Sequence, residues 1–309
     1  MADKLFVSVS PHIRGSATTR RIMLDVLIAL VPAFIASIII FGPRAALIVF
    51  VCIATCILCE WGFEKAMKKP ITIGDFSAAI TGTLLAFNLP PAIPIWQAVF
   101  GSAVAIILVK QLFGGLGKNF ANPAITARIV MFLAFSTTMT TWTLPLDGIT
   151  GATPLALLTK GDTSALPTLW HMLLGLRGGC IGETCAPALL LGGIYLIARR
   201  VITWHAPVTF IVVVFAFTAL LGREPVYQLL SGGLFLGAIF MATDYVTTPM
   251  TGRGRLVFGI GAGLLTVIFR VYSSYPEGVS FAILLMNILT PYINKFTVTR
   301  PLGSINVKR

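Results

Sequence analysis

The chain has 309 residues, of which 56% are hydrophobic and 11% are charged, and its net charge is +12. Soluble domains carry about 25% charged residues, so the composition excludes an ordinary soluble fold and indicates a membrane protein. The positive charge is assigned to loops on the cytoplasmic side of a membrane, where lysine and arginine collect. Nucleic-acid binding is not expected, because the aromatic residues lie within apolar runs and are not interleaved with the basic clusters.

Apolar runs of roughly 20 residues recur along the chain, and this is the length at which a helix crosses the hydrocarbon core of a bilayer. The alternation of apolar and polar residues that a membrane β-barrel needs is absent from the sequence. We therefore predict an all-α polytopic membrane protein that crosses the lipid bilayer with about ten transmembrane helices. The predicted spans are 22–41, 45–63, 76–93, 95–113, 123–139, 186–202, 207–222, 226–243, 256–271 and 279–296.

The chain is predicted to divide into two membrane halves with a loop between them. The first half covers residues 1–139 with spans one to five, the polar loop covers 140–185, and the second half covers 186–309 with spans six to ten. Basic residues gather at alternate connections, so the positive-inside rule places both termini in the cytoplasm and the loop outside. The basic residues behind this assignment are Lys4, Arg14, Arg20, Arg21, Lys65, Lys68, Lys69, Lys118, Arg128, Arg199, Arg200, Arg253, Arg255, Lys295, Arg300, Lys308 and Arg309.

A weak internal repeat relates the two halves. Pro91 and Pro249, and likewise Gly101 and Gly259, are separated by the same offset. Because each half would hold an odd number of spans, the second copy is inverted in the membrane. The pattern predicts two inverted five-helix repeats with interrupted helices, an architecture that places ligand sites near the bilayer midplane.

The outer loop contains the segment Asp147-Gly148-Ile149-Thr150-Gly151-Ala152-Thr153. It resembles the D-x-x-[ST]-G-A-T motif on which a flavin transferase attaches FMN, through its phosphate, to the last threonine. The chemistry suits these residue types, because a threonine hydroxyl forms a phosphoester that is stable in water. Small residues before it leave room for a second enzyme to approach the backbone. The alternative is a helix start, with Thr150 or Thr153 as the N-cap before Pro154.

Other segments extend this resemblance over nearly the whole chain. They are Ser10–Arg14, Leu89–Pro91, Lys110–Gly117, Asn119–Pro123 and Met241–Thr251. Together they resemble the RnfD proteins of the Rnf complex and a related membrane protein of the Na+-translocating NADH:quinone reductase. RnfD is the better match, because the reductase protein usually has a longer N-terminal extension. The sequence departs from the family at Tyr245, where proline is common.

The resemblance implies a flavin-bearing membrane subunit of an ion-translocating ferredoxin:NAD+ oxidoreductase in the bacterial cytoplasmic membrane. Such a protein is part of a redox-driven translocase and is not catalytic alone. The resemblance also implies covalent FMN on Thr153 and a second, noncovalent flavin such as riboflavin. The implied partners are the other membrane and peripheral Rnf subunits, including a second flavin-bearing one, and the flavin transferase during maturation. Whether Na+ or H+ is moved stays open.

Two Gly/Pro-interrupted segments offer residues for the noncovalent flavin. Glycine permits close approach to a flat ring, and amides can hydrogen-bond to the carbonyls and nitrogens of a flavin. The alternative is that these residues form a re-entrant turn with helix caps. The candidates are Gly114, Gly115, Asn119, Asn122, Asp244, Thr247 and Thr248.

Asp25, Glu60 and Asp75 are candidates for an ion path, because charges in membrane spans are costly and tend to be functional. Each lies near the end of a span, so the alternative is that it reaches water or pairs with a neighbouring basic residue. Lys110 and Arg270 also end spans, and we expect both to extend their charged groups toward water.

The five cysteines give weaker signals. Cys52, Cys56 and Cys59 share one helix face, and packing is favoured over metal binding because an iron–sulfur cluster normally takes four ligands. Cys180 and Cys185 in the outer loop are either a disulfide or two thiols. No metal ligand set is visible in the sequence.

The inverted repeat is equally compatible with another class of protein, a small-solute channel or transporter without a cofactor. A structural membrane scaffold is a third possibility. The outer-loop motif separates these functions, because neither a channel nor a scaffold needs a flavin attachment site.

Overall fold

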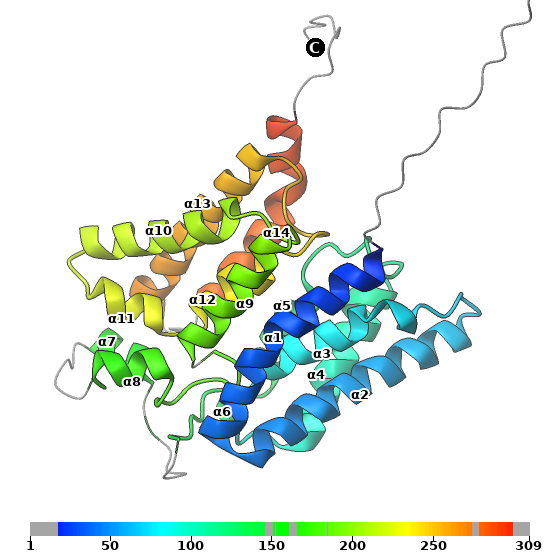
Figure 1. Ribbon diagram of the computed structural model, residues 1–309, viewed down its shortest axis with the longest axis horizontal. Coiled ribbons are helices and arrows are strands. Elements are labelled where there is room, and N and C mark those ends of the chain that lie inside the picture. Colours follow the sequence, from blue (N-terminus) through cyan, green and yellow to red (C-terminus); the bar gives the residue numbers. More distant parts are fainter. Residues whose placement is uncertain are drawn as a thin grey trace, which may run out of the picture.

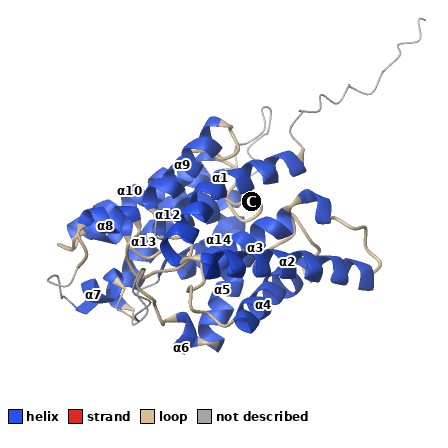
Figure 2. Cartoon of the chain, turned by 60° about the horizontal axis from the view of Figure 1, so that its bottom comes forward, coloured by secondary structure: helices blue, strands red, loops and turns tan. Residues whose placement is uncertain are grey.

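The computed structural model describes residues 18–145, 151, 153–160, 166–183, 185–273 and 278–298. Over these residues the chain consists of helices and loops, without a β-strand (Figure 2). The elements in chain order are α1 (Thr19–Phe41), α2 (Pro43–Ala66), the 3-10 turn η1 (Ile73–Asp75), α3 (Ser77–Phe87), α4 (Ile95–Ala103), the π-helical segment η2 (Val104–Gln111), α5 (Pro123–Ala134), α6 (Ser136–Met139), α7 (Pro154–Lys160), α8 (Leu169–Leu174), α9 (Ala186–Ala198), α10 (His205–Leu220), α11 (Pro225–Leu230), α12 (Leu234–Leu236), the π-helical segment η3 (Gly237–Met241), α13 (Gly252–Tyr272) and α14 (Gly278–Thr297).

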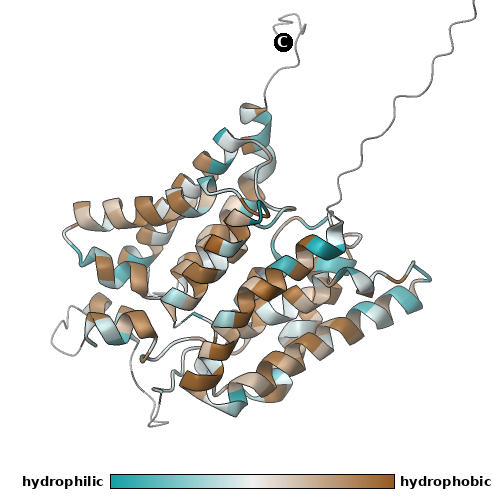
Figure 3. Cartoon of the chain, in the orientation of Figure 1, coloured by the Kyte–Doolittle hydropathy of each residue, from teal (hydrophilic) through white to brown (hydrophobic). Residues whose placement is uncertain are grey.

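Helices occupy all ten predicted spans, and the prediction of an all-α polytopic membrane protein is confirmed. Four helices, α1, α2, α13 and α14, have 20 to 24 residues and are long and apolar enough to cross a membrane. Shorter apolar helices lie at 77–87, 95–111, 123–134, 186–198 and 205–220. Figure 3 shows hydrophobic residues along most of these helices.

The third and fifth spans are shorter than predicted. The third, predicted over 76–93, is helical only to Phe87, because Pro90 and Pro91 follow and proline neither donates an N–H nor permits helical backbone before it. The fifth, predicted over 123–139, breaks at the end of α5 and resumes as the short helix α6.

The eighth span, predicted over 226–243, is broken into α11, α12 and η3. The break lies at Ser231–Gly233, where Gly232 and Gly233 both have a φ of 64°. This left-handed conformation is accessible to glycine and ends the helical path.

Arginines satisfy the backbone at both breaks. Arg44 donates to the carbonyls of Pro91, Ala92 and Ile93 at 3.1, 3.2 and 3.2 Å. Arg270 donates to the carbonyls of Gln228, Ser231 and Gly232 at 2.6, 2.8 and 3.3 Å. Unpaired carbonyls are costly in a membrane interior, so these bonds are what allows the two spans to be interrupted.

Two basic residues differ from their sequence assignment. Arg270 is only 2% exposed, so the expectation that it reaches water is wrong. The sequence assigns Arg128 to the cytoplasmic loops, but it is buried inside α5, where it donates to Asn88 Oδ1 and Ser280 Oγ at 2.9 Å. Both corrections have one cause: an interrupted span leaves acceptors inside the bundle that can hold a cation.

The two halves meet through equivalent spans. The first spans, α1 and α9, pack together so closely that a Cβ on Gly192 would lie 2.2 Å from the Ala29 carbonyl oxygen. They run antiparallel, since Asp25 near the start of α1 contacts Tyr195 and Arg199 at the end of α9. The fifth spans, α5 and α14, also pack together (Figure 1). Antiparallel pairing of equivalent spans is what an inverted repeat requires.

The helix ends that carry most of the basic residues lie on one side of the molecule, here called the basic end. In Figure 1 the start of α1, the end of α2 and the end of α14 face the upper right, whereas α7 and α8 lie at the lower left. The segment before α9 docks against the break after α3, where Ile181 N donates to Leu89 O and Gly182 N to Phe87 O, each at 3.0 Å.

Gly82 sets the distance between α2 and α3. A Cβ at this position would lie 2.8 Å from Ile53 Cα and 2.9 Å from Cys52 O, both backbone atoms that cannot turn aside. We expect Gly82→Ala to lower the stability of the folded protein by about 1–3 kcal/mol through overpacking. The thermal unfolding midpoint of detergent-solubilised protein measures this.

Gly62 on α2 is the matched control, because nothing lies within 4 Å of a Cβ built there. Gly62→Ala is expected to leave the midpoint unchanged or slightly raised, since alanine favours a helix. Equal midpoints for the two variants would contradict the close packing of α2 and α3.

Candidate functional site

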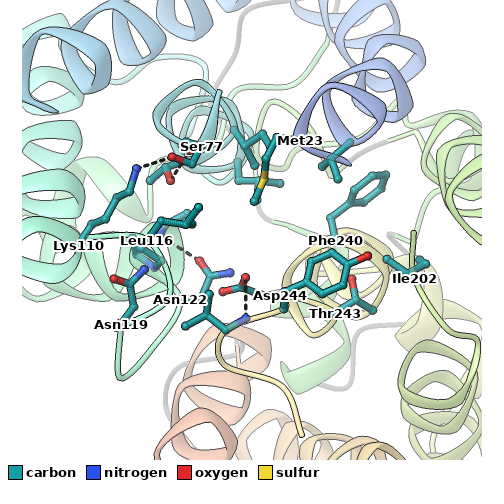
Figure 4. Close-up of a pocket in the computed structure, with 18 of the residues that line it drawn as sticks. Met23, Ser77, Lys110, Leu116, Asn119, Asn122, Ile202, Phe240, Thr243 and Asp244 are labelled. Atoms are coloured by element: carbon teal, nitrogen blue, oxygen red, sulfur yellow. Dashed lines mark hydrogen bonds between the residues drawn. The ribbon is translucent and has the colours of Figure 1, made fainter. Parts of the chain in front are cut away.

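A cavity lies between the two halves toward the basic end, and we call it the inter-half cavity (Figure 4). It encloses about 770 Å³ of empty space and is partly open. The first half contributes Met23, Val26, Ser77, Ile80, Thr81, Leu84, Lys110, Leu116, Asn119, Asn122, Pro123 and Ala124, and the second half Leu196, Ile202, Phe240, Thr243, Asp244, Tyr245 and Val246. Most of the lining is apolar with a few convergent polar groups, which is typical of ligand sites.

Three of the predicted flavin residues, Asn119, Asn122 and Asp244, line this cavity although they come from different halves. Two others, Gly114 and Gly115, do not line it and lie instead in a neighbouring surface cleft.

The remaining two candidates lie behind the lining. Thr247 is buried and donates to Asp244 Oδ2 at 3.1 Å. Thr248 donates to the Ala242 carbonyl at 2.9 Å. Both therefore hold the segment after η3 in shape, and neither faces the inter-half cavity.

Asn122 and Asp244 also have the capping roles that the alternative interpretation predicted. Asn122 Oδ1 accepts from Ala124 N at 3.0 Å and from Ile125 N at 3.4 Å, which makes it the N-cap of α5. Asp244 Oδ1 accepts from Val246 N at 3.4 Å. These side chains stay in place without a ligand, so their carbonyl and carboxylate groups are fixed before anything binds.

Asn119 is different, because its Oδ1 atom has no hydrogen-bond partner although the residue is only 9% exposed. A buried acceptor without a donor costs about 1–3 kcal/mol. Such an atom at a cavity wall indicates a ligand that supplies an N–H or O–H group, and a flavin ring carries an N–H between two carbonyls.

Lys110 also lines the cavity, and sequence reasoning missed it. The expectation that it extends toward water is wrong, because it is 1% exposed. Its Nζ donates to Glu60 Oε1 and to Ser77 Oγ, each at 2.6 Å. The signal that could have found it is Glu60, a second buried charge of opposite sign on another span.

The ion-path candidates are all engaged by partners from elsewhere in the chain or by a turn. Glu60 pairs with Lys110, and Asp25 accepts from Tyr195 at 3.0 Å and from Arg199 at 3.4 Å. Asp75 Oδ1 accepts from Ser77 N at 2.8 Å and from Ser77 Oγ at 2.6 Å, so it caps the start of α3. None of these pairings is with an adjacent basic residue of the sequence.

Thr153 lies at the opposite end of the molecule from the basic end. It is half-buried and caps α7, because its Oγ1 accepts from Ala156 N at 3.2 Å. The capping alternative is therefore correct for Thr153. An ester would replace only the hydroxyl hydrogen, so the oxygen keeps a lone pair for the cap.

Of the remaining motif residues, Gly151 donates to Trp142 O at 3.0 Å, and its ideal Cβ would lie 3.0 Å from the Leu144 side chain. Asp147, Thr150 and Ala152 lie outside the described residues.

Thr153 shares a small cavity of about 230 Å³ with Arg177, Glu183 and Gly232. Arg177 is buried, and burial lowers the pKa of its guanidinium, an effect that the nearby Glu183 partly offsets. Arg177 Nε and Glu183 Oε2 are buried without a hydrogen-bond partner. Arg177 therefore has an unused donor beside the hydroxyl of Thr153.

The cysteines do not form a site with other ligands in the part of the chain that the structure describes, where no group of three His, Cys, Asp or Glu residues could hold a metal ion. Cys52 and Cys56 are buried against neighbouring helices. No disulfide joins Cys180 to Cys185, and Cys180 Sγ lies 3.4 Å from Arg128 NH2.

The fold and the inter-half cavity define a class: a multi-pass helical membrane protein of two related halves with a ligand-sized site between them. Comparison with protein families gives the particular assignment. Residues 6–303 match the model of the NQR2, RnfD, RnfE family, and the chain belongs to this family.

Related proteins match over nearly their whole length, and each is the component named D of its complex. The chain is 47% identical to that of the Na(+)-translocating ferredoxin:NAD(+) oxidoreductase complex of Acetobacterium woodii, covering 99% of this chain and 97% of the relative. It is 42% identical to that of the proton-translocating ferredoxin:NAD(+) oxidoreductase complex of Clostridium ljungdahlii, with 94% of each chain covered. It is 39% identical to that of the ion-translocating oxidoreductase complex of Stutzerimonas stutzeri, with 92% of each covered. The predicted family resemblance is confirmed.

Proposed function

We propose that this chain is the flavin-bearing RnfD component of an Rnf-type ferredoxin:NAD+ oxidoreductase, a redox-driven ion translocase. In this proposal it passes electrons through a covalent FMN on Thr153 and a noncovalent flavin, riboflavin or a close relative, in the inter-half cavity. The observation that carries the proposal is the full-length similarity to relatives named as the corresponding component of such complexes. A bound flavin would supply one- and two-electron transfer.

The surroundings of Thr153 suit a phosphoester. The hydroxyl is half-buried rather than enclosed, and Arg177 lines the adjoining cavity with an unpartnered Nε. A guanidinium is a good donor to phosphate oxygens. In the proposal Arg177 therefore holds the phosphate after attachment, while the Ala156 N–H keeps the threonine oxygen in position.

The inter-half cavity suits an isoalloxazine ring. The ring needs donors and acceptors along one edge and apolar walls on its faces. Asn119 Oδ1 offers an unused acceptor, and Asn122 and Lys110 add an amide and an ammonium group. In the proposal these three side chains bind the polar edge, and the apolar residues of the lining enclose the rings.

The helix α3 separates the two proposed sites. Ser77 at its start lines the inter-half cavity, and Phe87 at its end contacts the segment that carries Glu183. The helix has 11 residues, so its axis is roughly 17 Å long. This is about half the thickness of a bilayer core, and the interrupted third span therefore brings the two sites closer together than a full span would.

We further propose that the basic end faces the cytoplasm of a bacterial inner membrane, so that Thr153 faces outside, where a flavin transferase acts. The concentration of lysine and arginine at the basic end supports this orientation. The described residues are taken up by membrane helices and short connections, so contact with ferredoxin and NAD+ falls to partner subunits of the complex, one of them carrying a further flavin.

The alternative, a small-solute channel without a cofactor, draws on the same inverted halves and the same cavity. It leaves the outer-loop motif and the similarity to oxidoreductase components unexplained, so flavin content decides between the two.

Thr153→Ala tests the covalent site. We expect the wild-type band to fluoresce under ultraviolet light in a denaturing gel and the variant band to be dark, because a methyl group cannot form the phosphoester. Thr168→Ala is the matched control, since Thr168 caps α8 in the same way that Thr153 caps α7. A fluorescent Thr153→Ala band would reject the assignment.

Asn119→Leu tests the noncovalent site. In a complex that also carries Thr153→Ala, the variant is expected to release severalfold less flavin on denaturation, because the polar edge of the ring loses an acceptor. Asn287→Leu is the control: Asn287 is equally buried, its amide atoms also have no partner, and it does not line the cavity. Equal losses in both variants would mean that the effect is on folding.

Orientation is tested by labelling cysteines with a membrane-impermeant thiol reagent in whole cells, in a background without the native cysteines. Trp170 is 72% exposed on α8 and Ile71 is 63% exposed at the basic end. Trp170→Cys is expected to react in intact cells and Ile71→Cys only after lysis. The reverse result would refute the proposed orientation.

A further inference from the structure

Two hollows lie on either side of a short row of polar side chains. One is the inter-half cavity, whose wall includes Ser77 and Lys110. The other is a surface cleft at the basic end, lined by Glu64, Thr72, Asp75, Gln111 and neighbouring residues, and we call it the basic-end cleft. Exposed residues at its rim, such as Thr72, give it contact with bulk water.

Three side chains connect the two hollows without a gap. Lys110 Nζ lies 2.6 Å from Ser77 Oγ, and Ser77 Oγ lies 2.6 Å from Asp75 Oδ1. Ser77 and Lys110 are buried, whereas Asp75 is half-buried and lines the cleft. Ammonium, hydroxyl and carboxylate are all groups that can give up and receive a proton, and each is within hydrogen-bond reach of the next.

Glu60 makes Lys110 suitable for this position. Its Oε1 lies 2.6 Å from Lys110 Nζ and its Oε2 has no partner. Burial is unfavourable for both charges, so a proton can move between the two groups, giving a neutral pair, without leaving an isolated charge in the interior.

A second set of contacts leads to the same cleft but cannot conduct protons. Gln111 Nε2 donates to Glu60 Oε1 at 2.8 Å and to Glu64 Oε1 at 3.4 Å. A carboxamide holds these carboxylates in place, but it does not exchange protons at a useful rate. The path to water therefore runs through Ser77.

The ionisable groups around Lys110 come from every neighbouring element. Glu60 and Cys56 face it from α2, and Asp75 reaches it through Ser77 from the turn before α3. Asp244 lines the same cavity from the second half. A charge change in the cavity is thus met by two carboxylates, Glu60 and Asp75, that are already joined to Lys110.

We propose that Lys110, Ser77 and Asp75 form a proton relay between the inter-half cavity and water in the basic-end cleft. The inference rests on the proposed function, in which the cavity holds a flavin. Full reduction of a flavin takes two electrons, delivered here by partner subunits, and two protons, and oxidation returns them. The relay supplies or removes those protons.

Each transfer leaves the relay balanced. When Lys110 gives a proton to the cavity, its amine takes one from the Ser77 hydroxyl, Ser77 takes one from Asp75, and Asp75 takes one from cleft water. In the observed arrangement Lys110 donates to Ser77 and Ser77 donates to Asp75. Proton release to the cleft needs no rotation, whereas uptake requires a protonated Asp75 and a turned hydroxyl.

Ser77→Ala tests the relay in the intact complex, because it removes the middle group and leaves the Lys110–Glu60 pair. Electron transfer from ferredoxin to NAD+ is expected to slow roughly 10- to 100-fold, with a larger solvent deuterium isotope effect and unchanged flavin content. Thr83→Ala is the control: it removes another buried hydroxyl of α3, bonded to Ala79 O and remote from the cavity lining. Its rate is expected to equal that of wild type.

Asp75→Asn separates proton transfer from structure, because its amide oxygen still accepts the Ser77 hydrogen bonds. We expect the same slowing, with partial rescue by azide, a small weak acid that can enter the cleft. Redox-difference infrared spectra supply a readout independent of turnover: a protonated-carboxyl band in wild type should vanish in Asp75→Asn.

The outcomes distinguish the relay from the flavin it serves. A Ser77→Ala complex with normal flavin content, rate and isotope effect would overturn the relay and leave the proposed function standing. A Thr153→Ala complex that releases no flavin on denaturation would overturn the cavity assignment and the relay together.

Discussion

The structure depends on arginine side chains that pair with backbone carbonyls where membrane spans are broken. A helix interrupted inside a bilayer exposes acceptors that water cannot reach. Arg44 supplies donors to residues 91–93 after α3, and Arg270 does so for residues 228–232. Each arginine comes from a different helix than the break it serves, so the breaks also fix how helices pack within each half. Removing either cation would leave several carbonyls unpaired at once.

Shortened spans create the space that the function needs. Because α3 begins at Ser77 and ends at Phe87, its two ends reach two different sites within one bundle. At its start the two halves stand apart and leave the inter-half cavity, and at its end the segment around Glu183 packs close to Thr153. A full-length third span would fill neither role. The π-helical segment η2 adds to this, since it directs Lys110 inward to Glu60 instead of outward to the membrane surface.

The sequence predicted the larger features because they follow from composition and periodicity. The ten spans, the antiparallel halves and the meeting of Asn119, Asn122 and Asp244 were all accessible from apolar runs and Gly/Pro breaks. The ends of the broken spans were not, because where a helix stops in the bundle depends on which distant side chain receives its free carbonyls. The same reason explains why the expectation for Lys110 and Arg270 is wrong: a cation at a span end extends to water by default, and only the three-dimensional position of Glu60 or of residues 228–232 keeps it inside.

The relatives named sodium-translocating and proton-translocating are 47% and 42% identical to this chain, so overall similarity does not distinguish the transported ion. The carboxylates themselves are more informative. Sodium at Glu60 would have to displace the Lys110 ammonium at 2.6 Å, and at Asp25 it would compete with Arg199. A proton needs only to redistribute within hydrogen bonds that already exist. The acids in the described part of this chain are therefore arranged to handle protons, and a preference for sodium would have to come from other residues or from the partner subunits.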